Sequence, residues 1–143
     1  MSTNAEKIVA FHQAIDAGYP DTPTLPTAAL LDLRQTLITE EYKEVMEAFE
    51  ALSHGRETEL TPLAHELADL LYVTYGALAA CGIDADAVFA EVHAANMRKV
   101  SGPRRADGKI LKPADWKPAD VAAVLAQQAA NQPPSNNQDA PDG

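Results

Sequence analysis

Two acid-bearing stretches with helical periodicity constrain the fold of this chain more than any other feature. They span residues 38–45 and 64–71. With a rotation of about 100° per residue, the apolar side chains around each stretch form one stripe, and carboxylates fall within or beside it. These carboxylates belong to Glu41, Glu44, Glu66 and Asp69. The pattern predicts that acids from two helices point towards a shared interior.

Ionised carboxylates at such positions require a partner, because burying an unpaired charge is strongly unfavourable. Arg34 and Lys43 are the only Lys or Arg residues of the first helix, and the second helix has none. Mg²⁺ or Mn²⁺, which prefer oxygen ligands, therefore suit the acids better than local ion pairs do. The alternative is a pair of ordinary solvated helix faces, and the presence of two inward pairs favours the metal site over it.

The composition favours a single helical domain. The chain has 143 residues, of which 46% are hydrophobic and only 6% aromatic, enough for a core but poor in strand formers. The net charge of −10 argues against nucleic-acid binding, because phosphates would repel the chain. The single Cys81 fits a reducing cytosol. Because no signal peptide and no apolar run long enough to span a membrane is present, we expect a cytoplasmic protein without a membrane partner.

Start and stop signals divide the chain into five helices. Their expected ranges are 4–17, 28–53, 62–81, 85–100 and 119–130. The expected N-caps are Thr3 or Asn4, Thr27, Thr61 and Asp84, and the expected terminating glycines are Gly18, Gly55 and Gly82. We expect residues 1–130 to form one domain and residues 131–143, which are rich in Asn, Gln, Pro and Asp, to be a disordered tail.

The same periodicity predicts which faces are buried. In the helix over residues 28–53, the apolar face consists of Leu31, Ile38, Tyr42, Val45, Phe49 and Leu52. In the helix over residues 85–100, the expected buried positions are Val88, Phe89, Val92 and Ala95. Asn96 falls on the same side, where a buried amide needs a partner from another helix or from a ligand.

The segment from residue 98 to residue 117 is strongly basic in an otherwise acidic chain. It holds seven of the eleven Lys and Arg residues, namely Arg98, Lys99, Arg104, Arg105, Lys109, Lys112 and Lys117. Glycines and prolines make it irregular, Asp107-Gly108 indicates a turn, and Trp116 is the only tryptophan. Such a loop suits an anionic ligand, although a plain solvated surface loop fits the same residues.

Together, an acidic cluster and a basic loop indicate a polyanionic substrate that is chelated by metal. A nucleoside triphosphate is the commonest molecule of this kind. The chain has neither a Gly-x-x-x-x-Gly-Lys-Ser/Thr loop nor a Gly-x-Ser-x-Gly elbow. Metal-assisted hydrolysis of a phosphoanhydride therefore remains as the expected reaction class.

The acidic motifs also resemble those of a known superfamily. Glu40-Glu41-x-x-Glu44 followed by Glu66-x-x-Asp69 is similar to the signature of the all-α NTP pyrophosphohydrolases, which include MazG-type enzymes, dimeric dUTPases and phosphoribosyl-ATP pyrophosphohydrolase. Phe11-His12, the proline-rich linker, Arg34 and the segment from Asn96 to Pro118 resemble the phosphoribosyl-ATP pyrophosphohydrolase-like branch. Within that branch, residues 63–76 and 101–109 resemble a bacterial MazG-like enzyme that cleaves dUTP.

This resemblance implies a four-helix core and specific roles for individual residues. The implied Mg²⁺ or Mn²⁺ ligands are Glu41, Glu44, Glu66 and Asp69, with Glu40 binding a further metal or orienting the attacking water. The implied substrate contacts are Arg34, Asn96, Lys99, Arg104, Arg105, Lys109, Lys112 and Trp116. The products would be a nucleoside monophosphate and pyrophosphate, with dUTP the favoured substrate, and the enzyme would act as a homodimer or higher homo-oligomer.

Three other interpretations remain open. Phosphoribosyl-ATP is the alternative substrate for the same chemistry. A carboxylate-bridged iron protein is a different class, but no Glu here has a His three residues later, as such proteins require. A non-catalytic helical interaction module, such as an antitoxin-like partner, would need none of the acids for its function.

Overall fold

The structure is a computed structural model, and it describes residues 1–131 of the chain. These residues form five helices, α1 (Asn4–Ala14), α2 (Ala28–Ser53), α3 (Thr61–Ala80), α4 (Ala85–Met97) and α5 (Val121–Ala130). The predicted all-α class is confirmed, and every helix overlaps the range expected for it. From residue 132 onwards, the tail expected to be disordered lies outside the described residues.

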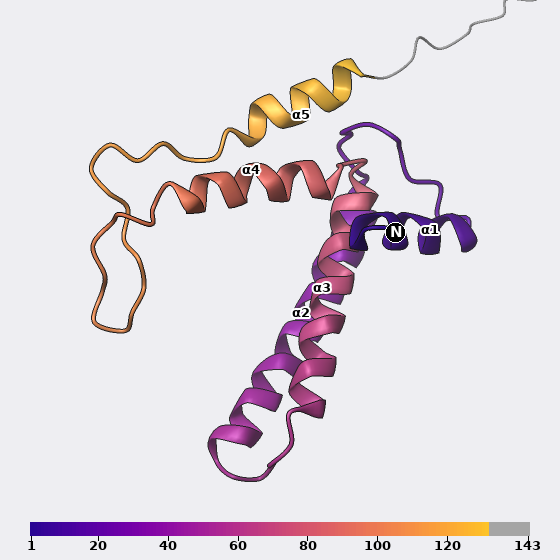
Figure 1. Ribbon diagram of the computed structural model, residues 1–143. Helices are drawn as coiled ribbons and strands as arrows, with labels where there is room; N and C mark the ends of the chain where they lie inside the picture. Colours follow the sequence, from indigo (N-terminus) through magenta and orange to yellow (C-terminus); the bar gives the residue numbers. More distant parts are fainter. Residues whose placement is uncertain (132–143) are drawn as a thin grey trace, which may run out of the picture.

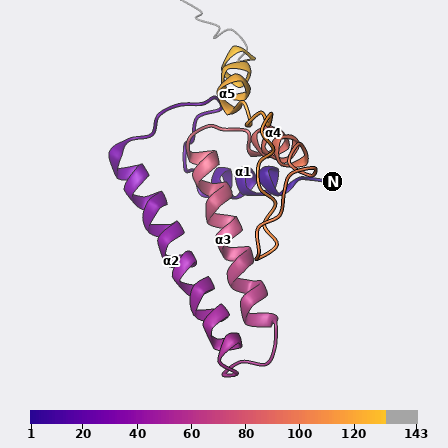
Figure 2. The same cartoon turned by 90° about the vertical axis from the view of Figure 1, so that its left-hand side faces the viewer.

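The two helices that carry the acids form a long hairpin. α2 and α3 lie side by side in both views, and they make the most extensive contact between any two elements (Figures 1 and 2). α1 packs against α3, while α4 packs on α5. Figure 1 shows α4 leading away from the end of α3, and α5 running back in the opposite direction beside α4.

Side-chain caps explain where most helices begin. The Thr3 side chain accepts a hydrogen bond from the Glu6 N–H, and Glu6 accepts one from the Thr3 N–H, which is a complete capping box. Thr27 caps α2 and Asp84 caps α4, as predicted. Asp120 caps α5 in the same way. Each of these capping bonds joins residues two or three positions apart in the sequence, so the caps themselves are local features.

The end of α1 differs from its prediction. The helix stops at Ala14, three residues before the expected end, and Asp16, with φ of 51°, is the first left-handed residue after it; Gly18, with φ of 67°, follows two residues later. The N–H groups of Asp16 and Ala17 donate to the carbonyls of Gln13 and His12, which is the bonding of a Schellman motif. An aspartate tolerates this left-handed conformation better than most side chains, so no glycine was needed to end the helix.

Two other boundaries also differ. Thr61 is the first residue of α3 rather than its N-cap; the cap is Leu60, whose side chain makes no capping bond, and the proline of the first turn lacks an N–H that would need one. α4 ends at Met97 instead of continuing to residue 100, because the N–H groups of Lys99 and Val100 turn back to carbonyls only three residues earlier.

The buried core of a single chain is small. Its buried hydrophobic residues are Ile8, Val45, Ala80, Ala85 and Ala95. Phe89 and Val92, expected to be buried, are 67% and 38% exposed, and Asn96 beside them is exposed as well. On α2, Leu31, Tyr42 and Phe49 are between 44% and 54% exposed. The periodicity found these apolar stripes, but the chain's own helices cover only parts of them.

Among residues 1–131, no single helix is both long and apolar enough to cross a bilayer. Only α3 and α4 taken together reach that length and hydropathy, and the chain bends by 113° between them.

Candidate active site

Three carboxylates from α2 and α3 meet across the hairpin. Glu41, Glu66 and Asp69 each offer an oxygen atom, and these oxygens all lie within 4.8 Å of one another. The three residues are half-buried. The spacing Glu-x-x-Asp puts the two α3 acids one turn apart on the same face, and the antiparallel packing of α2 places Glu41 opposite them. The sequence predicts that at least four acids, Glu44 among them, point towards a shared interior; three of them converge here, whereas Glu44 is exposed and lies outside this group.

The environment of Glu41 raises the pKa of its carboxyl group. Loss of hydration raises the pKa of this carboxyl group, and a hydrogen bond with Glu44 and the negative charges of Glu44, Asp69 and Glu66 raise it further. The Oε2 atom of Glu41 is buried and has no hydrogen-bond partner. Glu44 is therefore electrostatically part of the cluster, although its own side chain is mostly exposed.

The fit of a cation to this cluster can be judged from its donors. Within the described part of the chain, no Lys or Arg pairs with any of the four acids; the side chain that does contact one of them is His65, whose Nε2 lies 3.0 Å from Asp69 Oδ2. Oxygens that share one Mg²⁺ or Mn²⁺ ion lie roughly 3–4 Å apart, which the cluster spacing allows. An orphaned buried carboxylate oxygen surrounded by other carboxylates is what a hard divalent cation would satisfy.

Two residues near the cluster, Glu40 and His65, lie where the sequence did not predict them. Glu40, the expected orienting residue, is exposed and does not belong to the group of three converging acids. His65 was not singled out from the sequence, yet it lies against Asp69. The signal was available, because residues four apart on a helix face each other.

Arg34 lies in a different environment, between α1, the linker and α3. Its guanidinium group bonds to His12 Nε2 at 3.1 Å and donates a hydrogen bond to the Tyr19 hydroxyl. It also stacks over the Tyr19 ring, with its central carbon 5.3 Å from the ring centroid. A Cβ atom on Gly76 would come within 2.6 Å of this group, so the absence of a side chain there makes room for it. The expected substrate contact of Arg34 stays a prediction.

The basic segment forms a short hairpin rather than a fully irregular loop. Arg104 and Ile110 make an antiparallel bridge, and the predicted turn at Asp107-Gly108 closes it, with Gly108 at φ of 90°. The side chain of Arg105 is bound to Asp107. Arg104, Lys109 and Lys112 are exposed and, among the described residues, form no ion pair.

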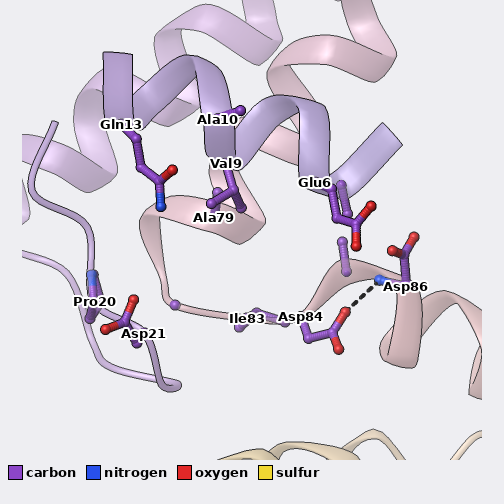
Figure 3. Close-up of a pocket in the computed structure, with 13 residues that line it drawn as sticks. Glu6, Val9, Ala10, Gln13, Pro20, Asp21, Ala79, Ile83, Asp84 and Asp86 are labelled. Carbon is purple, nitrogen blue, oxygen red and sulfur yellow. Dashed lines mark hydrogen bonds between the residues drawn. The ribbon is translucent and has the colours of Figure 1, made fainter. Parts of the chain in front are cut away.

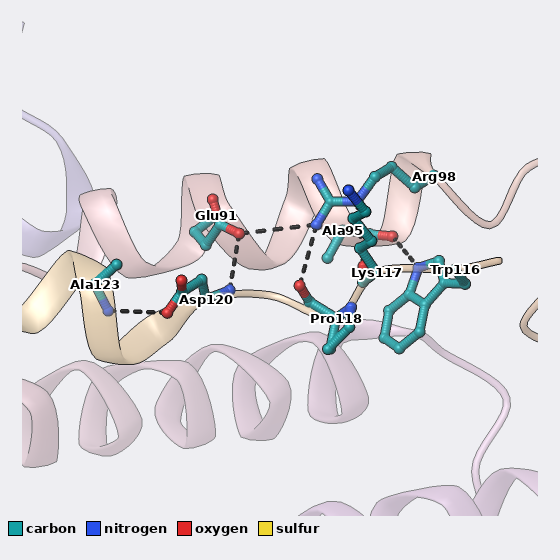
Figure 4. Close-up of polar contacts among 8 residues, drawn as sticks. All are labelled: Glu91, Ala95, Arg98, Trp116, Lys117, Pro118, Asp120 and Ala123. Carbon is teal, nitrogen blue, oxygen red and sulfur yellow. Dashed lines mark hydrogen bonds and ion pairs between the residues drawn. The ribbon is translucent and has the colours of Figure 1, made fainter.

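The segment that follows, residues 116–120, lies along α4 and is hydrogen-bonded to α4 and to Arg98 (Figure 4). Trp116 donates its indole N–H to the carbonyl of Ala95 at 2.7 Å. Arg98 donates to the carbonyls of Lys117 and Pro118, and Glu91 accepts from the N–H of Asp120. Arg98 therefore has a structural role. We call residues 85–120 the basic arm; it consists of α4, the basic hairpin and the segment hydrogen-bonded to α4.

The acids and the basic arm do not meet within one chain. Figure 1 shows the hairpin of the arm at the end of α4 that is farther from α3, well separated from the helices that carry the acids. No hydrogen bond or ion pair among residues 1–131 joins the bases of the arm to the acids of the cluster. Asn96, Lys99 and Trp116 are thus brought together with one another but not with Glu41.

A separate hollow lies away from the acid cluster. It measures 420 Å³ and is lined by α1, the linker and the turn between α3 and α4 (Figure 3). Three of its acids have structural partners: Glu6 and Asp84 cap helices, and Asp86 accepts a hydrogen bond from the Thr3 hydroxyl at 2.6 Å. These contacts account for three of the four acids that line the hollow, the fourth being Asp21.

The fold and the cluster define a class: an all-helical protein in which two antiparallel helices present carboxylates suited to a divalent cation. A family model described as phosphoribosyl-ATP pyrophosphohydrolase matches residues 8–96, which is more than half of the chain and includes all the clustered acids. The chain belongs to this family, within the MazG-like all-α NTP pyrophosphohydrolase superfamily. Membership indicates a nucleotide pyrophosphohydrolase. No curated protein was found to match the chain.

Proposed function

We propose that this protein hydrolyses the bond between the α- and β-phosphates of a nucleotide and releases pyrophosphate. The observation that carries the proposal is the convergence of Glu41, Glu66 and Asp69 in a chain of a pyrophosphohydrolase family. Glu41, Glu44, Glu66 and Asp69 are the proposed ligands of Mg²⁺ or Mn²⁺. When bound, such an ion supplies neutralisation of phosphate charge and a lowered pKa for water.

The residues around the ion have separate tasks in this reaction. Glu40 orients the attacking water and accepts its proton. The water oxygen forms a bond to the α-phosphorus, and the bond from that phosphorus to the bridging oxygen breaks. Pyrophosphate leaves with the bonding electron pair, and the proton passes from Glu40 to solvent.

The bases that bind the phosphates come, in this proposal, from a second copy of the chain. The basic arm stands away from the acids of its own chain, and the arm and the hairpin both expose apolar side chains, such as Phe89 and Phe49. Burying these faces against another copy would bring Lys99, Arg104 and Lys112 towards the partner's acids, with opposite charges facing each other. A homodimer is the smallest assembly that completes the site.

Two substrates fit the proposed chemistry. The family match favours phosphoribosyl-ATP, which carries a triphosphate chain. The resemblance of residues 63–76 and 101–109 to a dUTP-cleaving enzyme favours dUTP, and it includes a segment that lies beyond the matched residues. The two differ in base and sugar but present the same phosphoanhydride bond to the acids.

A substrate panel tests the proposal. Purified protein is incubated with phosphoribosyl-ATP, dUTP and the other common nucleoside triphosphates, with Mg²⁺ and with EDTA, and pyrophosphate is measured. We expect metal-dependent pyrophosphate release from at least one substrate, and the ratio of kcat/KM values identifies the preferred one. If none of the nucleotides is cleaved, the proposed function is wrong.

A further inference from the structure

Trp116 holds two lysines at one aromatic ring. The ammonium group of Lys99 lies 4.9 Å from the ring centroid and that of Lys112 lies 4.6 Å from it. These distances are those of cation–π contacts. The two positive charges are consequently held in one small region, although they come from residues on either side of the hairpin of the basic arm.

The two lysines differ from the arm's structural bases. Arg98 pairs with Glu91 at 3.8 Å, and Arg105 is bound to Asp107. Among the described residues, neither Lys99 nor Lys112 has a carboxylate partner. Within residues 1–131, the only polar contact of either ammonium group is that of Lys99, which donates to Asn96 Oδ1 at 2.8 Å. Their charges are therefore neutralised by no group of the described chain.

Trp116 is itself firmly placed. Its indole N–H is bound to the carbonyl of Ala95, in the last turn of α4, and the residues after it are tied to Arg98 and Glu91 (Figure 4). The ring is half-buried, so one part is anchored while another remains accessible. Two like charges held together by a fixed ring repel each other until an anion lies between or beside them.

We propose that Trp116 is a positioning residue that presents Lys99 and Lys112 together as a binding site for a pyrophosphate group. The inference rests on the proposed function, because it assigns this arm the phosphate end of the substrate. It also gives Trp116 a role other than stacking on a base: both cation–π contacts and the anchoring bond to Ala95 hold the lysines in place. Inorganic pyrophosphate, without metal or nucleoside, is then a sufficient ligand.

The single tryptophan makes the site directly observable. Pyrophosphate is titrated into the protein in EDTA, at constant ionic strength, while the fluorescence of Trp116 is recorded. We expect a saturable change, and we expect Lys99→Gln and Lys112→Gln each to weaken binding at least about tenfold, as loss of a charged phosphate contact does. Lys117→Gln is the matched control: it removes a neighbouring exposed charge and should change binding by less than about twofold.

Variants of Trp116 separate positioning from simple stability. Trp116→Leu keeps both lysines and is expected to weaken pyrophosphate binding, followed by calorimetry, by about tenfold, while Trp116→Phe retains part of the affinity because an aromatic ring remains. With a cleavable nucleotide, Trp116→Leu should raise KM and leave kcat unchanged. Circular dichroism establishes that each variant is folded.

The results that overturn the inference are distinct from those that overturn the proposed function. No saturable fluorescence change, an equal change with chloride, or unaltered affinity in Trp116→Leu would each exclude the site. If nucleotides are cleaved but pyrophosphate does not bind near Trp116, only this inference fails. If pyrophosphate binds there and no nucleotide is cleaved, the enzymatic proposal fails and the anion site stands.

Discussion

At the scale of single residues, Glu41 is the acid of the cluster whose negative charge is destabilised by its surroundings. Its carboxyl group has lost hydration and faces three other carboxylates, and its pKa is raised as a result. Without a cation, the charged form of this residue opposes folding. In the proposed function this charge is needed to bind a cation, so function and stability make opposite demands on one side chain.

Replacing Glu41 with Gln tests this conflict. The neutral amide keeps the shape of the side chain and removes one of the repelling charges, so the metal-free variant is expected to melt at a higher temperature than the wild type. Turnover of a cleavable nucleotide with Mg²⁺ should fall by at least about 10²-fold, because an essential ligand is lost. Glu47→Gln, on the exposed side of α2, is the control for both measurements and should alter neither. Retained turnover in Glu41→Gln would contradict the assignment.

A second test at the residue scale asks whether Gly76 is needed to make room for the Arg34 guanidinium. In an ordinary helix interior, Gly→Ala stabilises by about 1 kcal/mol. Here the added methyl group would displace the Arg34 guanidinium from His12 and Tyr19, and losing hydrogen bonds of a charged group costs about 1.5–3 kcal/mol. We therefore expect Gly76→Ala to lower the free energy of unfolding, measured in urea.

A double-mutant cycle tests whether displacement of the Arg34 guanidinium causes the destabilisation expected for Gly76→Ala. In an Arg34→Met background the guanidinium group is gone, and Gly76→Ala should then stabilise the protein, as helix propensity alone requires. The same destabilisation in both backgrounds would show that Arg34 is not what the glycine makes room for.

At the scale of elements, α1 is held by a histidine that must stay neutral. His12 is buried, and burial together with the charge of Arg34 lowers its pKa. Because Arg34 is always protonated and bonds to Nε2, that nitrogen accepts, and the proton of the neutral ring resides on Nδ1. No acid on α1, α2 or α3 is bonded to the ring.

This arrangement predicts how stability depends on pH. The folded protein takes up a proton at His12 less readily than the unfolded chain, so the contribution of His12 is present above about pH 6.5 and is lost as the pH falls towards the lowered value. We expect the difference in unfolding free energy between wild type and His12→Gln to shrink as the pH is lowered from about 8 to 5. The other histidines are common to both proteins and cancel. A difference that grows in acid would contradict the assignment.

Also at the scale of elements, features fixed by local bonds could be predicted from the sequence, whereas features fixed by long-range packing could not. Thr3, Thr27 and Asp84 cap their helices through local bonds, and the spacing of the acids on each helix is local too, so all of these were predictable. The direction of α4 depends on long-range packing. Periodicity therefore identified the apolar face of Phe89 and Val92 but not that the chain leaves it exposed.

The contacts of Arg34 with His12 and Tyr19 were likewise not predictable. They join three elements across a proline-rich linker, and no local pattern encodes that meeting. The turn at Asp107-Gly108 could be predicted, whereas the bridge between Arg104 and Ile110 that makes the segment a hairpin could not.

At the scale of the whole molecule, a composite site predicts complementation between two variants that are each impaired in a different part of the site, with activity measured at substrate concentrations below the wild-type KM. Glu41→Gln lacks a working acid cluster and Lys99→Gln lacks a working arm. If they are mixed and allowed to exchange subunits, each heterodimer has one intact site, and activity should recover to about a quarter of the wild-type value. Each variant exchanged with itself is the control. Mixed protein that sediments as a dimer but remains inactive would contradict a site shared between copies.

The most direct test of the central claim is a crystal structure of the protein grown with Mn²⁺, with data collected for anomalous scattering. We expect a strong anomalous peak enclosed by the carboxylates of Glu41, Glu66 and Asp69, with about 2.0–2.4 Å between the Mn²⁺ ion and the carboxylate oxygens. A map with no peak there, and with these acids bound instead to Lys or Arg side chains, would contradict it.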